Sequence, residues 1–310
     1  MTALICGSVA YDNIMVFEDS FRHHILPDKI HILNVSFLVP RLRREFGGCA
    51  ANIAYNLKLL GEDPLPMATV GHDFGPYRDW LRQWGIRTDH IRTLDDYYTA
   101  QAFITTDLDR NQITAFHPGA MNRSELNKVT DATGVTLGMV SPDGRTGMIE
   151  HAEQFAAAGI PFIFDPGQGM PMFNGEELRR FIDQSTWVTV NDYEWQLLKD
   201  RTGWDVEDVT SRVDALIVTR GSEGSSIYTA SAEYEIPIVK PAAIEDPTGC
   251  GDAYRAGLVY GLLHKLDWET TGRIASLMGA IKIEQHGTQN HIFTRQQFED
   301  RFKASFGRSL

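Results

Sequence analysis

Short apolar segments alternate with helical segments along most of this 310-residue chain. The expected strands lie at 3–7, 65–70, 137–140, 161–164, 187–190 and 216–219. The expected helices lie at 50–60, 77–84, 146–158, 176–184 and 192–201, and the chain finishes with two long helices at 252–265 and 268–285. This alternation predicts an α/β fold, a doubly wound and mostly parallel sheet flanked by helices. Ligands of such folds collect at the carboxyl ends of the strands.

Two insertions, at about 13–46 and 97–117, interrupt the alternation. Their β-like runs lie at 14–17, 30–37, 100–106 and 112–116. Strands that fall between βα units do not readily join the central sheet, so we expect a separate small sheet. Placed over the strand ends, it would act as a lid that excludes water. The expected organisation is a single α/β domain spanning 1–310 with this lid.

Composition restricts the possible partners. A formal net charge of −12 opposes nucleic acid binding, because a phosphate backbone attracts a basic surface. Cys6, Cys49 and Cys250 have no metal-ligand spacing and an odd count, which is typical of reduced thiols. No stretch is long and apolar enough to span a bilayer, and the first residues do not resemble a signal peptide. We therefore expect a cytoplasmic protein that binds neither nucleic acid nor membrane.

The most informative motif is Gly249-Cys250-Gly251-Asp252, directly before an expected helix. Glycines let consecutive backbone N–H groups turn toward one point, and the helix N-terminus adds a partial positive charge. An aspartate beside such an anion hole is suited to taking a proton from a hydroxyl that attacks a phosphoryl group. The motif alone also fits an aspartate that merely caps a helix, so both interpretations stay open.

Two further segments have the chemistry to hold a sugar. Gly48 belongs to a Gly-Gly pair before the first long helix, where the backbone can approach a ligand closely. Asn52, in the first turn of that helix, can both donate to and accept from hydroxyl groups. Asp12 follows the first strand and can accept two hydrogen bonds from a vicinal diol. The alternatives are a tight turn at Gly48 and an ordinary loop aspartate at position 12.

Other nucleotide-binding signatures are absent from the sequence. It contains no GxxxxGK[ST] phosphate loop and no protein-kinase motif set, and no GxGxxG follows the first strand. A phosphoryl transfer by this chain would therefore depend on the motif that ends at Asp252.

Together these segments resemble the PfkB carbohydrate kinase family, also called the ribokinase family, over essentially the whole chain. The two family signatures are similar to the run from Gly47 to Gly61 and the run from Asp246 to Asp252. The resemblance implies that Asp252 is the catalytic base and that Asp12 binds the sugar. It also implies that the anion hole is formed by Gly249, Cys250 and Gly251.

The nucleotide site is implied by the same resemblance. Asn191 and Glu194 are similar to the N-x-x-E motif that organises Mg²⁺ and phosphate, with Glu194 at the metal. The implied nucleotide-binding residues are Asn191, Thr219, Gly221, Gly224, Gly251 and Gly287. ATP and Mg²⁺ are the implied cofactors, and K⁺ is a further candidate. Arg255, one helical turn after Asp252, could lower the pKa of that carboxylate or reach a phosphate, and the alternative is a surface ion pair without a role in the site.

Within the family, the likeness is greatest to bacterial adenosine kinases and broad-range purine nucleoside kinases, in the runs 36–39, 116–121, 191–195 and 246–257. This likeness implies that Phe116 and Phe103 of the lid stack on the base. Gln168 follows an expected core strand, where it could hydrogen-bond a purine edge. For the two phenylalanines, an inward-facing position in the hairpin is the alternative. The exposed edge of a small lid sheet also favours a homodimer through the lid.

We therefore expect an ATP-dependent nucleoside kinase that phosphorylates the 5′-hydroxyl of purine nucleosides, namely adenosine and also inosine and guanosine. Two alternatives stay open: a PfkB-type sugar kinase acting on ribose or fructose, and a non-catalytic sensor of nucleosides or nucleotides. Asp252 favours an enzyme, because a sensor needs no base inside an anion hole.

Overall fold

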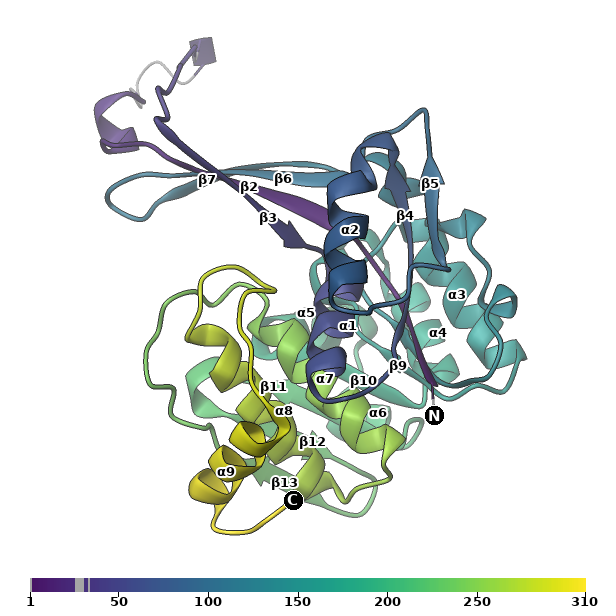
Figure 1. The fold of residues 1–310 in the computed structure, drawn as a ribbon. Coiled ribbons are helices and arrows are strands. Elements are labelled where there is room, and N and C mark those ends of the chain that lie inside the picture. The colour runs from purple at the N-terminus through teal and green to yellow at the C-terminus, as the bar shows by residue number, and fades with distance from the viewer. Residues whose placement is uncertain (1, 26–30, 33) are drawn as a thin grey trace.

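The computed structural model describes residues 2–25, 31, 32 and 34–310. In this part of the chain, nine strands form one large sheet (Figure 1). In spatial order they are β13 (Glu233–Ile236), β12 (Ser225–Tyr228), β11 (Ala215–Thr219), β10 (Trp187–Asn191), β9 (Phe162–Phe164), β8 (Val135–Val140), β1 (Thr2–Cys6), β4 (Leu65–Gly71) and β5 (Ile91–Leu94). All pairs from β5 to β11 are parallel, and β12 and β13 are antiparallel additions at one edge. The predicted fold class is confirmed.

Helices cover both faces of this sheet. They are α1 (Cys49–Leu59), α2 (Gly75–Gln83), α3 (Arg145–Ala157), α4 (Gly175–Gln184), α5 (Asp192–Thr202), α6 (Val206–Thr210), α7 (Cys250–Leu263), α8 (Trp268–Ile283) and α9 (Arg295–Phe306). Leu4 and Cys6 of β1 pack in one apolar cluster with α3, α4, α5 and α6. Ala3 and Ile5 pack in a second cluster with α1, α7, α8 and α9. Because neighbouring strand residues point to opposite faces, β1 is buried on both, which explains why such strands are continuous apolar runs in the sequence.

A second sheet of four strands, within the described residues, projects from one end of the main body (Figure 1). Its order is β3 (Arg41–Gly47), β2 (Ala10–Val16), β6 (Ala100–Thr106) and β7 (Gln112–His117). Strands β2 and β6 pair in parallel, and the two outer pairs are antiparallel. The expected small separate sheet is therefore present, and we call it the lid sheet.

One lid strand does not lie where the sequence predicted it. The prediction of a strand at 30–37 is wrong for residues 31, 32 and 34–37, which form none, while residues 30 and 33 lie outside the described residues. The strand is β3 instead, which pairs with β2 at seven positions. Its first four residues are exposed and three of these are arginines, so no apolar alternation marks the strand in the sequence. Pairing with β2, and not an apolar pattern, determines it.

The end of the chain also differs from the prediction. The chain does not finish with two long helices, because α9 follows α8. In α9 only Phe298 and Phe302 are buried, so its apolar pattern is weak, although a capping box joins Thr294 and Gln297 at its start. The short edge strands β5, β12 and β13 were not predicted either. None of the helices that the structure describes combines the length and the apolarity needed to cross a membrane.

Candidate active site

Two motifs that lie 200 residues apart in the sequence meet at the N-termini of α1 and α7. Asn52 of α1 donates a hydrogen bond from Nδ2 to Oδ2 of Asp252 in α7, at 2.8 Å. Gly249 precedes α7 with φ 79°, and a Cβ there would lie 3.0 Å from Cγ2 of Thr288, so only glycine fits this turn. The fold thus places both sequence signatures at one end of the sheet, as expected for an α/β ligand site.

The environment of Asp252 gives it the proton affinity of a general base. Burial raises the pKa of Asp252 to about 6, although the hydrogen bond from Asn52 and the charge of Arg255 act in the opposite direction. A carboxyl group with a pKa near neutrality is largely ionised at physiological pH and still accepts a proton readily. This carboxylate is therefore suited to deprotonating a hydroxyl group.

The side chain of Asn52 is oriented by a chain of hydrogen bonds. Gln289 donates from Nε2 to Oδ1 of Asn52 at 2.9 Å and to the Tyr77 hydroxyl at 2.6 Å. Trp80 in turn donates from Nε1 to Oε1 of Gln289 at 2.9 Å. These bonds leave the amide nitrogen of Asn52 facing Asp252. An amide nitrogen has two N–H groups, so Asn52 can hold the base and donate to a substrate hydroxyl.

Sequence reasoning missed this supporting chain. The aromatic residues of α2 are spaced as core residues would be, and Tyr77 is indeed fully buried. Their polar atoms nevertheless connect α2 to the site, since the Tyr77 hydroxyl also donates to the carbonyl of Gly47 at 2.7 Å. The only sequence signal was the position of Gln289, close after the predicted nucleotide-binding residue Gly287.

The first turn of α7 provides the expected anion site in part. The N–H groups of a first helical turn have no acceptor inside the helix, and Gly251 is exposed. The N–H of Cys250, however, donates to the carbonyl of Pro247 at 3.2 Å. A bound phosphoryl oxygen would have to displace this long bond to use the Cys250 donor.

Asp12 lies on β2 among other carboxylates. Burial, with the charges of Glu45 and Asp246, raises the pKa of Asp12 to about 6. A Cβ at Gly47 would lie 2.5 Å from Oδ2 of Asp12, and one at Gly48, where φ is 91°, would lie 2.6 Å from the backbone nitrogen of Ala10. The Gly-Gly pair therefore allows a close approach of backbone to Asp12, whereas the approach to a ligand that the sequence suggested stays a prediction.

The register of the lid sheet separates the two candidate stacking residues. Asp12 pairs with Ala102 across β2 and β6, and Ala102 pairs with Phe116 across β6 and β7. Paired residues share a face and consecutive residues alternate, so Phe116 lies on the face of Asp12. Phe103 lies on the opposite face, with Asn13. Both rings are accessible, with 52% of Phe116 and 40% of Phe103 exposed, so neither belongs to an inward-facing core of the hairpin.

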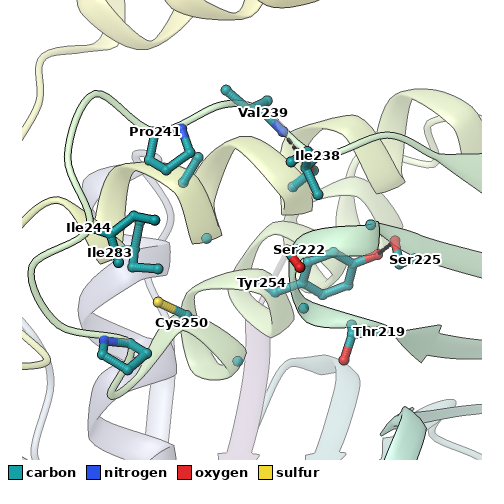
Figure 2. A pocket seen from close by; sticks show the side chains of 17 residues that line it. Thr219, Ser222, Ser225, Ile238, Val239, Pro241, Ile244, Cys250, Tyr254 and Ile283 are labelled. Carbon is teal, nitrogen blue, oxygen red and sulfur yellow. Dashed lines mark hydrogen bonds between the residues drawn. The ribbon is translucent and has the colours of Figure 1, made fainter.

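A cavity of about 370 Å³ lies beside the N-terminus of α7. It joins the predicted nucleotide residues Thr219, Gly221 and Gly224 to Cys250 and Gly251. Its apolar lining comes from Ile238, Val239, Pro241, Ile244, Ala280 and Ile283. Figure 2 shows Thr219 and Tyr254 on one side of it and the apolar residues Pro241, Ile244 and Ile283 on another. A cavity with apolar walls and a few polar groups fits a flat aromatic base.

Two of the predicted nucleotide-binding residues, Asn191 and Gly287, do not line this cavity, and neither does Gln168, the predicted contact of a purine edge. Asn191 caps α5 with its side chain, and its backbone N–H donates to Glu194 at 2.8 Å, so the N-x-x-E motif is first of all a capping box. Gly287 donates its N–H to the carboxylate of Asp246 at 2.9 Å. Gln168 is exposed after β9.

A buried ion pair lies behind Asp252. Arg255 binds Asp165 through both Nε and Nη2 at 3.0 Å, and its Nη2 is 3.9 Å from Glu194. Only 6% of Arg255 is exposed, so it is not a surface residue. Burial, with the charge of Asp165, raises the pKa of Glu194 although Arg255 opposes this. Within the described ranges, no three His, Cys, Asp or Glu side chains are grouped to hold a metal ion.

Comparisons with known proteins agree with this geometry. Residues 12–295 match the pfkB family carbohydrate kinases. The nucleoside kinase of Methanocaldococcus jannaschii is 33% identical over 273 residues, which cover 87% of this chain and 89% of that protein. The structure of Burkholderia thailandensis nucleoside kinase in complex with inosine is 53% identical, covers 99% of each chain and has a TM-score of 0.91. Its complex with ADP-inosine is 54% identical, covers 99% of this chain and 97% of that one, and has a TM-score of 0.88.

The resemblance predicted from the sequence motifs is thereby confirmed, and so is a phosphotransferase with a hydroxyl acceptor. A sequence match over most of the chain, a nine-stranded sheet with a lid sheet, and the meeting of Asn52 with Asp252 agree with one another. This chain belongs to the PfkB family of carbohydrate kinases.

Proposed function

We propose that this protein is an ATP-dependent nucleoside kinase that transfers the γ-phosphoryl group of ATP to the 5′-hydroxyl of purine nucleosides. The observation that carries the proposal is the position of Asp252. Its half-buried carboxylate has a pKa raised to about 6 and lies at the N-terminus of α7. On one side is the apolar cavity, suited to the adenine of ATP, and the lid sheet with Asp12 belongs to the same end of the molecule.

The proposed reaction follows from these positions. Asp252 takes the proton of the 5′-hydroxyl as that oxygen bonds to the γ-phosphorus. The bond from the γ-phosphorus to the bridging oxygen breaks, and ADP leaves with the electron pair. The first turn of α7, with Gly249, Cys250 and Gly251 as its proposed donors, stabilises the charge on the transferred group. Asp12 and Asn52 hold the ribose hydroxyls, with Gly48 allowing the close approach.

The described residues fit Mg²⁺ as a companion of the nucleotide. A magnesium ion in such sites keeps several waters and is held by substrate phosphates and one or two carboxylates, and here no protein cage is present in the described residues. Glu194, at the start of α5, is the carboxylate that would hold it. When bound, the ion would neutralise phosphate charge, and Asn191 would fix Glu194 through the capping box.

The lid sheet favours a purine nucleoside over a free sugar as the substrate. Phe116 is exposed on the face of Asp12, where a base attached to a ribose held by Asp12 would meet an aromatic ring. A free pentose would leave that ring without a partner. The relatives reported above are nucleoside kinases, one of them in complex with inosine, which supports the same choice.

We also propose a homodimer and a cytoplasmic location. The lid sheet exposes Leu42, Phe103 and Ile113, and a homodimer through the lid would cover such residues. The three cysteines are free thiols, which suits a reducing compartment such as the cytoplasm.

A substrate panel tests the function. Adenosine, inosine, guanosine, ribose and fructose are each incubated with ATP and Mg²⁺, and ADP release is measured against the Asp252→Asn variant as background. We expect purine nucleosides to exceed both sugars by orders of magnitude in kcat/KM. A better rate with ribose or fructose would establish the sugar kinase, and no ADP release with any acceptor, despite nucleoside binding, would establish the sensor.

A further inference from the structure

Lys282, in the last turn of α8, is a lysine with no solvent-exposed surface. Its Nζ donates to the main-chain carbonyl of Asp246 at 2.7 Å and to that of Gln285 at 3.1 Å. Lysine is rarely buried completely, because an ammonium group loses much of its hydration free energy inside a protein. A position that buries one therefore needs compensation, and here carbonyl dipoles provide it.

The two carbonyls belong to the segments that support the anion site. Asp246 begins the turn that leads to Gly249 and α7, and Gln285 lies in the turn after α8. The Asp246 carboxylate accepts from the N–H groups of Thr248 and Gly287, both at 2.9 Å. Although burial opposes it, these bonds and the charge of Lys282 lower the pKa of Asp246, so the carboxylate is ionised. The ammonium group thus lies among main-chain carbonyls, with the Asp246 carboxylate nearby.

These polar contacts of Lys282 and Asp246 support the glycine turn before Asp252. The turn after α8 continues to Thr288, whose side chain packs against Gly249 so closely that a Cβ there would be 3.0 Å away. The backbone N–H groups of Glu245 and Asp246 donate to the carbonyl of Ile283, the last residue of α8, at 2.9 and 3.2 Å. A shift of either turn would therefore move the first N–H groups of α7.

Main-chain carbonyls that converge on a positive charge form the kind of site in which proteins hold a monovalent cation. We propose that the ammonium group of Lys282 acts as a built-in monovalent cation, which fixes the turns at Asp246 and Gln285 and so positions the anion site beside Asp252. Phosphoryl transfer then requires no added monovalent cation. The inference rests on the proposed kinase function, and Lys282 is a positioning residue because it acts through the turn.

The first experiment compares the unaltered protein in buffers whose only monovalent cation is tetramethylammonium, Na⁺, K⁺ or NH₄⁺. We expect kcat to stay within about twofold across the series, because the site already contains its charge. A kcat that rises severalfold with K⁺ or NH₄⁺ would overturn the inference, since an ion would then be missing from the folded enzyme.

The second experiment uses Lys282→Met, which keeps the unbranched chain as far as Cε and removes the charged nitrogen, so that its position becomes free for a cation. Lys303→Met, on the exposed side of α9, is the matched control. In tetramethylammonium we expect kcat of Lys282→Met to fall by roughly 10²-fold, because small displacements of positioning groups have effects of that size. Addition of K⁺ or NH₄⁺ should restore a large part of kcat, and neither ion should affect the control. Full activity of Lys282→Met, or a loss that no cation restores, would contradict the built-in cation.

A thermal melt separates this inference from the proposed function. The Tm of Lys282→Met should rise with K⁺ or NH₄⁺ and not with tetramethylammonium, whether or not nucleosides prove to be the substrate. Equal responses of Lys282→Met and Lys303→Met would overturn the inference without affecting the kinase assignment. If Lys282→Met does not fold, the cation series on the unaltered protein decides the question.

Discussion

The Asn52 amide nitrogen lies 2.8 Å from Oδ2 of Asp252, and this bond joins the N-terminal and C-terminal signatures of the family across the end of the sheet. The amide cannot rotate freely, because Gln289 donates to its oxygen at 2.9 Å. The bond stabilises the ionised carboxylate, whereas burial favours the protonated form. The balance between the two sets the proton affinity of the proposed base.

Replacement of Asp252 tests its role as the base. In Asp252→Asn, the shape of the side chain is kept and its ability to accept a proton is lost. We expect kcat to fall by at least ~10²-fold with little change in nucleoside affinity, because removal of a general base typically costs that much. Steady-state kinetics and calorimetric nucleoside binding measure the two quantities. Asp300→Asn, an exposed residue of α9, is the control, and a kcat of Asp252→Asn within tenfold of the parent would refute the assignment.

The pH dependence of the reaction should report the same group. Burial raises the pKa of Asp252 to about 6, and only its ionised form accepts a proton, so kcat/KM should fall as the pH drops through about 6. Asp12 also has a pKa of about 6, so the decline should be steeper than that for one proton. In Asn52→Ala the carboxylate loses a donor, and the acid limb should move to higher pH. A limb that stays in place would show that Asn52 does not tune the base.

The sequence predicted those parts of the fold in which helices bury both faces of a strand. Strands such as β1 and β8 are apolar runs because helices cover both of their faces, and that pattern is visible without a structure. The strand β3 could not be predicted, because its arginines face solvent and its pairing partner is distant in the sequence. Likewise α9 buries only two phenylalanines, too few for a clear helical period.

The sequence predicted candidate residues for the site but only some of the contacts between them. The family motifs pointed to Asp252 and Asp12, and also to Gly48 and Gly249, whose positive φ angles favour glycine. The sequence did not reveal that Asn52 would hold the base, since that contact spans 200 residues. Nor did it reveal that Phe103 and Phe116 lie on opposite faces, because a shift of the β6–β7 pairing by one residue would place both rings on the same face.

Removal of the Asp12 carboxylate should affect the sugar and not the chemistry. We expect Asp12→Ala to raise KM for nucleosides and to abolish discrimination against 2′-deoxynucleosides, because ribose hydroxyls without a partner cost roughly 1–3 kcal/mol. Kinetics with adenosine and 2′-deoxyadenosine measure the discrimination in parent and variant. The neighbouring variant Asn13→Ala changes the opposite face of β2 and is the control. If Asp12→Ala still prefers the ribonucleoside as strongly as the parent does, Asp12 does not recognise the ribose diol.

The two lid phenylalanines offer a matched pair, because the register places Phe116 on the face of Asp12 and Phe103 on the other face. If each site is formed within one subunit, Phe116→Ala should raise KM for nucleosides far more than KM for free ribose. Only a nucleoside presents a flat base to stack on. Phe103→Ala, a substitution of the same size on the same hairpin, should change nucleoside KM by no more than roughly twofold, as expected for a surface change.

Kinetics with adenosine and ribose on both variants give the comparison, and sedimentation shows whether either variant alters the oligomeric state. A larger effect of Phe103→Ala together with a loss of dimer would mean that the ring from one subunit reaches the site of another, which preserves the original assignment of Phe103 as a base contact. Equal effects of Phe116→Ala on adenosine and ribose would mean that the base is not stacked on this ring. In that case the exposed face of the lid sheet would no longer support a nucleoside, and ribose or fructose would become the better candidate for the acceptor.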